Sequence, residues 1–481
     1  MKYFVVAAKL MLIVCFFSIQ SFAQNSNDAL RLSEPGVITN AVSLGTANSN
    51  LALDNYAAVQ LNPAALGSIR KFQLTGGLLF NSLENETAFF NSTTQYSQNS
   101  MTLNQLGIAY PLPTARGSLV FGFGYSKVKE FNGAQKFNGF NSSNHSMIQD
   151  LANFNDDIAY DLGLSYPLKD ANNNYIKDTT GIAGNLNQSG LILQEGSLNS
   201  WSFSGAVEIS PNLFVGASFN IYTGAYRRDR EYYEDDTKNL YSGLLDPNDS
   251  ATEDLQSFFL NDIIDWDLSG WDMKLGLLFK PDRYSSFAAA IKLPTQYTIR
   301  ENYYIAGSSY FKNNAGYDLV PYDETIEYDI QTPFELSLGG SYSIAGLTVS
   351  GSGTMIDYTQ MEFTDGLTTE KRITNNKQIK DDFTTTFGYN LGLEYEIPYP
   401  NVKLRGGFMT IPSPYKADPS EFDKMFLTGG VGFVLSKVLV IDAAYSYGWW
   451  ETYGDNYGEN LSRTFQTINR SDFIVSMTYR M

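Results

Sequence analysis

Cysteine and histidine are nearly absent from this chain of 481 residues. The only cysteine is Cys15 and the only histidine is His145. A zinc site, or a nucleophile activated by histidine, needs such residues close together, so the sequence speaks against both. We therefore expect a protein that is not an enzyme, with no catalytic residue, no bound metal and no cofactor.

Charged side chains are also scarce, at 17% of the chain against about a quarter in soluble domains. Their balance is acidic, with a formal net charge of −18, and this charge repels the phosphates of nucleic acids. Acidic residues gather between 229 and 254, where they could surround a divalent cation or form a solvated surface. They lack the spacing of a calcium loop, which favours the solvated surface.

Long apolar runs are missing after the first 23 residues. In that first segment, Lys2 and Lys9 precede an apolar stretch at 10–17, and Ser21-Phe22-Ala23 forms a small-residue cleavage site. We expect residues 1–23 to be a signal peptide that is cleaved before Gln24. No later stretch approaches the roughly eighteen apolar residues that a membrane-spanning helix needs.

What the rest of the chain does have is a regular alternation of apolar residues with small or polar ones. Within 384–396, for example, Phe387 and Tyr389 alternate with Gly388 and Asn390. This period of two is typical of strands with one apolar face. We predict strands at 72–80, 101–110, 117–127, 201–209, 213–226, 268–280, 285–297, 332–343, 347–358, 384–396, 401–410, 424–435, 438–449 and 470–480.

The segments between these strands alternate in length. Short turns such as 210–212 and 344–346 alternate with long loops such as 128–200 and 227–267. A soluble sandwich has no reason to place every long loop at one end, whereas an outer-membrane barrel has short periplasmic turns and long extracellular loops. The pattern predicts an all-β transmembrane antiparallel barrel of about fourteen strands over residues 72–481.

Residues 24–71 precede the first predicted strand and consist largely of small or apolar residues with few charges. A disordered segment exposed to water would carry more charge. We expect this segment to be an N-terminal hatch, a plug packed inside the lumen of the barrel.

Short motifs follow one another in a recognisable order. Asn62-Pro63-Ala64 comes first, Gly270-Trp271 and Lys292-Leu293-Pro294-Thr295 lie in the middle, and Thr332-Pro333-Phe334-Glu335-Leu336 and Leu404-Arg405-Gly406-Gly407 follow. In this order, and on the strands predicted above, they resemble the FadL-type outer-membrane transporters and the related TodX-type hydrocarbon importers. The resemblance runs through nearly the whole mature chain.

The resemblance implies a barrel plugged by a hatch, with Asn62, Pro63 and Ala64 as the hatch motif. In that family, hydrophobic ligands are caught by extracellular loops, enter an apolar pocket and leave sideways through a kink in the third strand. Here Gly122 and Gly124 face inward on that strand and would let it bend or bulge. The same two glycines are equally suited to making room for the hatch.

Two cations of the predicted strand at 401–410 also face the lumen. Lys403 and Arg405 share the inward face of this strand. A guanidinium at this place could bind a fatty-acid carboxylate bidentately. The alternative, which the sequence favours, is an internal ion pair with Glu394 or Glu396 on the preceding strand.

The sequence therefore predicts passive transport of hydrophobic small molecules, long-chain fatty acids or similar lipophiles such as aromatic hydrocarbons, across the outer membrane of a Gram-negative cell. We expect a monomer that is inserted by the barrel-assembly machinery, contacts outer-membrane lipid and its ligand, and binds no nucleic acid. Two rivals stay open. One is a water-filled porin for polar solutes, and the other is a barrel scaffold of surface or secretion machinery that binds a partner protein.

Overall fold

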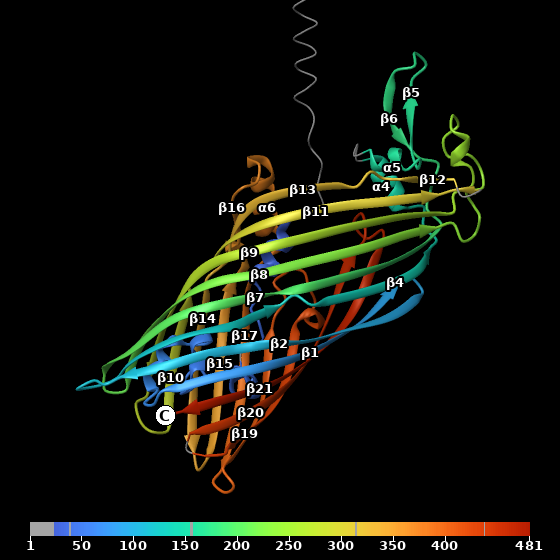
Figure 1. Cartoon of the computed structure of the whole chain (residues 1–481). Helices are drawn as coiled ribbons and strands as arrows, with labels where there is room; N and C mark the ends of the chain where they lie inside the picture. Colours follow the sequence, from blue (N-terminus) through green and yellow to red (C-terminus); the bar gives the residue numbers. More distant parts are fainter. Residues whose placement is uncertain (1–23, 38–39, 154–156, 313–314, 437) are drawn as a thin grey trace, which may run out of the picture.

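The alternating segments pair with their neighbours as antiparallel strands, and β1 (Gln73–Phe89) closes the sheet by pairing with β21 (Arg463–Arg480). In this computed structural model they form the predicted barrel of fourteen strands (Figure 1). The structure describes residues 24–37, 40–153, 157–312, 315–436 and 438–481. The predicted signal peptide, 1–23, lies outside these residues. Within them, no helix is long and apolar enough to cross a membrane.

Most wall strands are continuous, and the third continues from β3 into β4 (Gly133–Asn141) after residues 131–132, which belong to neither strand. The seventh and the eighth are each interrupted once. The interruptions contain Pro294 and Pro333, which have no N–H to donate to a ladder. The seventh strand consists of β10 (Ser285–Lys292) and β11 (Gln296–Tyr310), and the eighth of β13 (Tyr322–Gln331) and β14 (Glu335–Ile344). The other wall strands are β2 (Ser92–Leu112), β3 (Leu119–Glu130), β7 (Leu186–Ser210), β8 (Leu213–Asp235), β9 (Ser257–Phe279), β15 (Leu347–Asp357), β17 (Thr385–Ile397), β18 (Val402–Ile411), β19 (Lys424–Val434) and β20 (Leu439–Asp455).

Several strands are longer than the alternation predicts. The predicted strands at 285–297 and 332–343 leave residues 298–331 as a loop, and this is wrong because β11 and β13 occupy most of that segment. The loop predicted at 128–200 likewise contains β4 (Gly133–Asn141) and the first half of β7. These stretches lie toward the long-loop end, here called the outer end, where water or loops contact both faces of a strand. The contrast between apolar and polar faces, which carries the prediction, is therefore lost there.

The apolar face of the strands points outward. On β17, Tyr389 and Leu391 are 52% and 55% exposed. On β8 the large exposed apolar residues end at Ile221, and Arg227 and Asp229 follow on the same face toward the outer end. Such a continuous apolar band would be a liability in water, and it matches the lipid-facing band of a membrane barrel.

The described residues of 24–71 lie in the lumen, where the blue elements of Figure 1 sit inside the ring of strands. They contain α2 (Ser26–Ser33), α3 (Ala41–Gly45), η1 (Tyr56–Gln60) and η2 (Pro63–Ser68). Asn25, Asn40 and Asn62 cap three of these helices through their side-chain oxygens, as a helix start requires. The predicted location of the hatch inside the lumen is confirmed.

The long loops form a cap over the outer end with its own apolar core. The cap contains α4 (Met147–Asn153), α5 (Ile158–Asp161), and a hairpin of β5 (Tyr166–Lys169) and β6 (Tyr175–Thr179). The carboxylate of Glu234 on β8 ties the cap to the wall, since it accepts hydrogen bonds from Ser146 and from the Met147 amide. The remaining short elements are η3 (Ser250–Thr252), β12 (Gly316–Asp318), η5 (Tyr358–Gln360), β16 (Glu362–Asp365), α6 (Thr369–Asp382) and η6 (Ser420–Phe422).

The outward band generates a first prediction. Leu391→Arg places a charge in the middle of the apolar band of β17, where arginine in a barrel costs about 2–4 kcal/mol. Urea unfolding in lipid vesicles, followed by heat-modifiable mobility on gels, should show a loss of this size. Thr93→Arg on β2 is the matched control, because Thr93 also faces outward but lies beyond the band. Equal losses in the two variants would contradict the assigned band.

Candidate functional site

The hatch motif docks onto the inner wall of β8 and β9. The Asn62 side chain accepts a hydrogen bond from the Ala64 amide at 3.1 Å and donates to the Leu277 carbonyl of β9 at 3.1 Å. Pro63 takes the first helical position of η2, where its missing N–H costs nothing. Two glycines that face each other, Gly216 and Gly276, leave the space. A Cβ at these glycines would lie 2.5 Å from the Ala64 amide nitrogen and 2.0 Å from Asn62 Oδ1, respectively.

The inward glycines of the third strand also meet the hatch. A Cβ on Gly122 would lie 3.2 Å from both Leu66 and Tyr56, and one on Gly124 would lie 2.5 Å from Tyr56 Oη. The ladder between β2 and β3 runs unbroken through both positions, because Gly122 pairs with Ala109 and Gly124 with Gly107. The structure thus uses these glycines to make room for Tyr56, and the ladder ends only beyond them.

The break in the wall begins at the last pair of that ladder, Gln105 with Ser126. Residues 92–103 of β2 pair with β1 but have no ladder partner on their other edge among the described strands. On the other side, β3 has a register shift between Lys127 and Lys129, and the chain then continues as β4, paired with β7. The third strand therefore kinks at 127–132.

An interior cavity of about 210 Å³ lies between the hatch and the wall. Hatch residues form part of its lining, among them Leu32, Leu51, Val59 and Leu61. From the wall, the apolar side chains of Leu198, Ile356, Met409 and Ile411 and the charged side chains of Lys129, Lys274, Lys292 and Glu335 line it as well. The cavity is therefore amphipathic, with apolar surface beside a few charges.

A second hollow of about 660 Å³ lies at the kink and is lined mainly by polar residues of β2, β3, β7, β8 and β9. One short stretch of β3 lines both spaces. Val128 and Lys129 line the interior cavity, while Lys127 and Glu130 line this second hollow, here called the outer groove. The segment 127–130 thus contributes lining residues to both spaces.

Polar contacts hold the kinked segment against β2. The Ser100 hydroxyl donates to Glu130 at 3.0 Å, and the Asn132 amide donates to Ser100 at 3.1 Å. Lys127 forms a buried ion pair with Glu130 at 3.1 Å. Side-chain bonds therefore replace the missing backbone ladder at this point.

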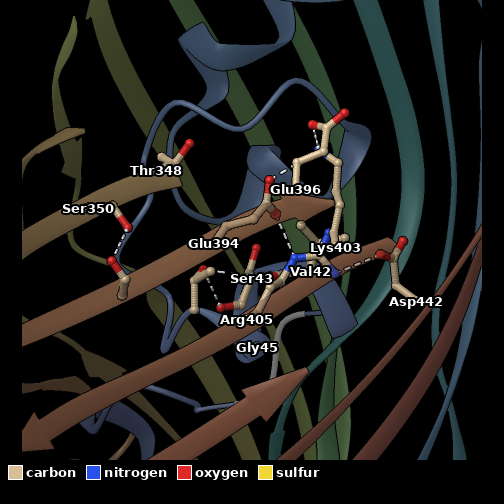
Figure 2. A network of polar contacts seen from close by, with 12 residues as sticks. Val42, Ser43, Gly45, Thr348, Ser350, Glu394, Glu396, Lys403, Arg405 and Asp442 are labelled. Atoms are coloured by element: carbon tan, nitrogen blue, oxygen red, sulfur yellow. Dashed lines mark hydrogen bonds and ion pairs between the residues drawn. The ribbon is translucent and has the colours of Figure 1, made fainter. Parts of the chain in front are cut away.

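Lys403 and Arg405, which could have met a ligand carboxylate, are paired within the wall (Figure 2). Arg405 contacts Glu394 and Asp442 at 2.7 Å each, and only 3% of its side chain is exposed. Lys403 contacts Glu394 at 3.1 Å and Glu396 at 3.4 Å. Neither cation lines the interior cavity, so the structure shows the internal ion pairs that were the alternative interpretation.

A further ion pair fastens the hatch to the wall. Glu34, which follows α2, contacts Lys424 of β19 at 2.7 Å and Lys129 of β3 at 4.0 Å. Burial alone would raise the pKa of Glu34, but Lys424 and Lys129 outweigh this effect and lower the pKa below its usual value. The Glu34 carboxylate is therefore ionised at neutral pH and holds the hatch between two strands.

No group of three or more histidine, cysteine, aspartate or glutamate side chains that could hold a metal ion occurs among the residues that the structure describes. Several acidic residues of 229–254 contact other parts of the protein: Asp229 pairs with Arg227, and Glu234 accepts a hydrogen bond from the cap.

The sequence analysis did not single out two inward lysines, Lys274 and Lys292. Lys274 stands between the outward residues Met273 and Leu275 in the alternation, so the period of two would have placed it in the lumen.

No protein-family model matches the chain, and no curated protein matches it. Solved structures do match. A FadL homologue from Pseudomonas aeruginosa has a TM-score of 0.60 at 13% identity, over 93% of this chain and 99% of that one. The toluene transporter TodX from P. putida has a TM-score of 0.54 at 12% identity, over 92% and 99% of the two chains. The CymD monoaromatic hydrocarbon channel has a TM-score of 0.50 at 14% identity, over 92% and 98%. At these identities the likeness concerns the fold, and at that level it confirms the resemblance seen in the sequence.

The ion pairs of Arg405 generate a prediction. Arg405→Met leaves Glu394 and Asp442 without their shared cation, and removing one partner of a buried pair costs about 3–5 kcal/mol. Urea unfolding should show this loss. Lys403→Met, the control, removes a cation whose side chain is 30% exposed, and should cost less than about 1 kcal/mol. If Arg405→Met keeps its stability but no longer binds hydrophobic ligands, this would contradict the purely structural role and show that Arg405 contacts the ligand.

The fit of Tyr56 into the wall generates another prediction. A Cβ on Gly107 would lie 2.0 Å from the Tyr56 ring, so Gly107→Val should push η1 out of its place. Limited proteolysis should then cut within residues 24–71, and the single-channel conductance in planar bilayers should rise. Adding Tyr56→Ala should reverse both changes, because it removes the clashing ring. A double variant that stays as open as Gly107→Val would show that the wall itself was damaged.

Proposed function

We propose that this chain is a passive channel for hydrophobic small molecules in the outer membrane of a Gram-negative cell, acting as a single chain. The observation that carries the proposal is the position of β3 residues 127–130 between the interior cavity and the outer groove. We infer that a molecule in the lumen leaves the barrel by displacing this segment, which lines both spaces. No energy source is required for such a step.

The physics of the site favours apolar cargo over polar solutes. The hatch lies in the lumen, and a cavity of about 210 Å³ lies between it and the wall. An apolar molecule gains about 25 cal/mol for each Å² that it removes from water, and the cavity offers it several leucine, valine and isoleucine side chains. From the lumen, the surrounding bilayer is a more favourable destination than water.

The likeness to solved channels supports the same function. The matching structures are described as a FadL homologue, a toluene transporter and a monoaromatic hydrocarbon channel. We propose long-chain fatty acids or similar lipophiles as the cargo of this chain. The long loops of the cap would meet such molecules first.

A cross-link across the break tests the proposal. The mature chain has no cysteine, because Cys15 lies in the predicted leader, so Ser100→Cys with Asn132→Cys introduces one defined thiol pair. Joining this pair with a short thiol cross-linker should hold the kinked segment against β2. Uptake of N-phenyl-1-naphthylamine into cells that carry the protein should then fall toward the level of cells without it.

The control places the same chemistry in an intact ladder. Ser286 of β10 and Ser341 of β14 are paired residues with hydroxyl oxygens 2.5 Å apart. Cross-linking Ser286→Cys with Ser341→Cys should leave uptake unchanged. Uptake that stays normal after cross-linking at the break would contradict the lateral route, and a large ion conductance in the wild type would favour a porin.

A further inference from the structure

Gln24 lies just before the hatch helix α2 and is bonded to both β11 and α6. Its side-chain amide donates to Glu301 of β11, and its side-chain carbonyl accepts from Lys371 of α6 at 2.5 Å. Asn375 of α6 donates to its main-chain carbonyl at 3.0 Å. Only 6% of the residue is exposed. These three wall and loop residues therefore form a fitted site around it, here called the Gln24 socket.

The carboxylate of the socket is itself buried. Glu301 is 0% exposed, and one of its oxygens accepts from the Trp266 indole and from the Tyr328 hydroxyl, both at 2.8 Å. A carboxylate that has lost its water needs such donors. The Gln24 amide supplies the donor for the other oxygen. The socket therefore takes one N–H, which meets Glu301, and one C=O, which meets Lys371.

Gln24 is also the residue at which the predicted signal-peptide cleavage begins the mature chain. The predicted cleavage site, Ser21-Phe22-Ala23, lies outside the described residues. Cleavage there gives Gln24 a free α-amino group, which is mostly protonated at neutral pH. The residue that follows, Asn25, is the N-cap of α2. Because the N-terminus of a helix carries positive partial charge, an ammonium beside it is unfavourable.

An N-terminal glutamine can lose this charge by an intramolecular reaction. The unprotonated α-amino nitrogen attacks the side-chain amide carbon Cδ and forms a new C–N bond. The bond from Cδ to Nε2 breaks, and Nε2 leaves as ammonia with the proton that the α-amino nitrogen gives up. The product is pyroglutamate, a neutral five-membered lactam. The two reacting groups belong to one residue, which favours the reaction, and no co-reactant is needed.

We propose that the mature chain begins at Gln24 and that this residue closes to pyroglutamate, the form in which the hatch occupies the socket. The lactam has one N–H and one C=O, the same two groups that the glutamine side chain presents to Glu301 and Lys371. It carries no charge that opposes the N-terminus of α2. The modification concerns the maturation of the hatch and does not depend on the cargo.

The test is the chemical state of the N-terminus in protein purified from the outer membrane of its native cells. In denaturant, free amines are first dimethylated, which marks an α-amine and prevents its later closure. Trypsin then releases the peptide 24–31, which ends at Arg31. In nearly all copies this peptide should be unlabelled and lighter than the glutamine peptide by the mass of one ammonia.

Two controls exclude closure during handling and report on burial. A synthetic, isotope-labelled peptide 24–31 with free glutamine is added at the labelling step and should be recovered dimethylated. Pyroglutamyl aminopeptidase, which removes a terminal lactam, should release it from the unfolded protein but not from the folded protein, because Gln24 is buried. Release at equal rates from both forms would contradict the socket.

A variant tests what the closure does for the hatch. Gln24→Asn keeps an amide but cannot form the same lactam, because the ring would have one member fewer. Its N-terminus should be dimethylated, and limited proteolysis within residues 24–71 should be about two- to fivefold faster, as expected for a positive charge beside a helix N-terminus. Proteolysis at the wild-type rate would contradict this role.

The wild-type peptide decides the modification even if Gln24→Asn fails to fold. A dimethylated Gln24, a first residue other than Gln24, or a blocked Gln24 that has kept its ammonia would each overturn the proposal. So would closure of the added peptide to the same extent as the protein. An unlabelled lactam at Gln24 beside a dimethylated added peptide supports it.

Discussion

A backbone N–H or C=O at the depth of a lipid bilayer has no water to bond, so every such group must find a partner within the chain. The closed antiparallel ladder from β1 to β21 meets this demand around almost the whole wall. Toward the outer end, water and loops can bond the backbone groups instead. There the ladder between β2 and β3 stops at Gln105 and Ser126. The one kink that the described wall has beside both hollows therefore lies where an opening costs least.

The position of the hatch depends on small residues in the wall. Gly216 and Gly276 face each other across β8 and β9 and admit Asn62 and its neighbours. Gly107 and Gly124 do the same for Tyr56. Because small residues are paired in register, whole patches of the inner wall come close to the hatch backbone. What remains unfilled is a limited cavity, and its shape is decided jointly by both parts.

Most charged side chains inside the barrel form ion pairs with one another. The pairs of Arg405 with Asp442, of Lys292 with Glu335 and of Glu34 with Lys424 neutralise one another. They hold strands to strands and hatch to wall. Lys274 alone among the lysines of the cavity lining lacks a carboxylate within reach in the described structure.

The alternation of residues is enough to predict a barrel of about fourteen strands and the face on which each side chain near the membrane lies, because a period of two is a local property that lipid imposes on every strand. It also indicated a plug, since 24–71 is too apolar for water. Which charges pair with one another cannot be read from this pattern. Whether an inward cation such as Arg405 or Lys274 has a partner depends on strand register and on where the hatch docks, and both bring together residues that are far apart in the chain. For the same reason the break at 127–132 escaped the pattern, because it arises from the course of neighbouring strands rather than from the glycines before it.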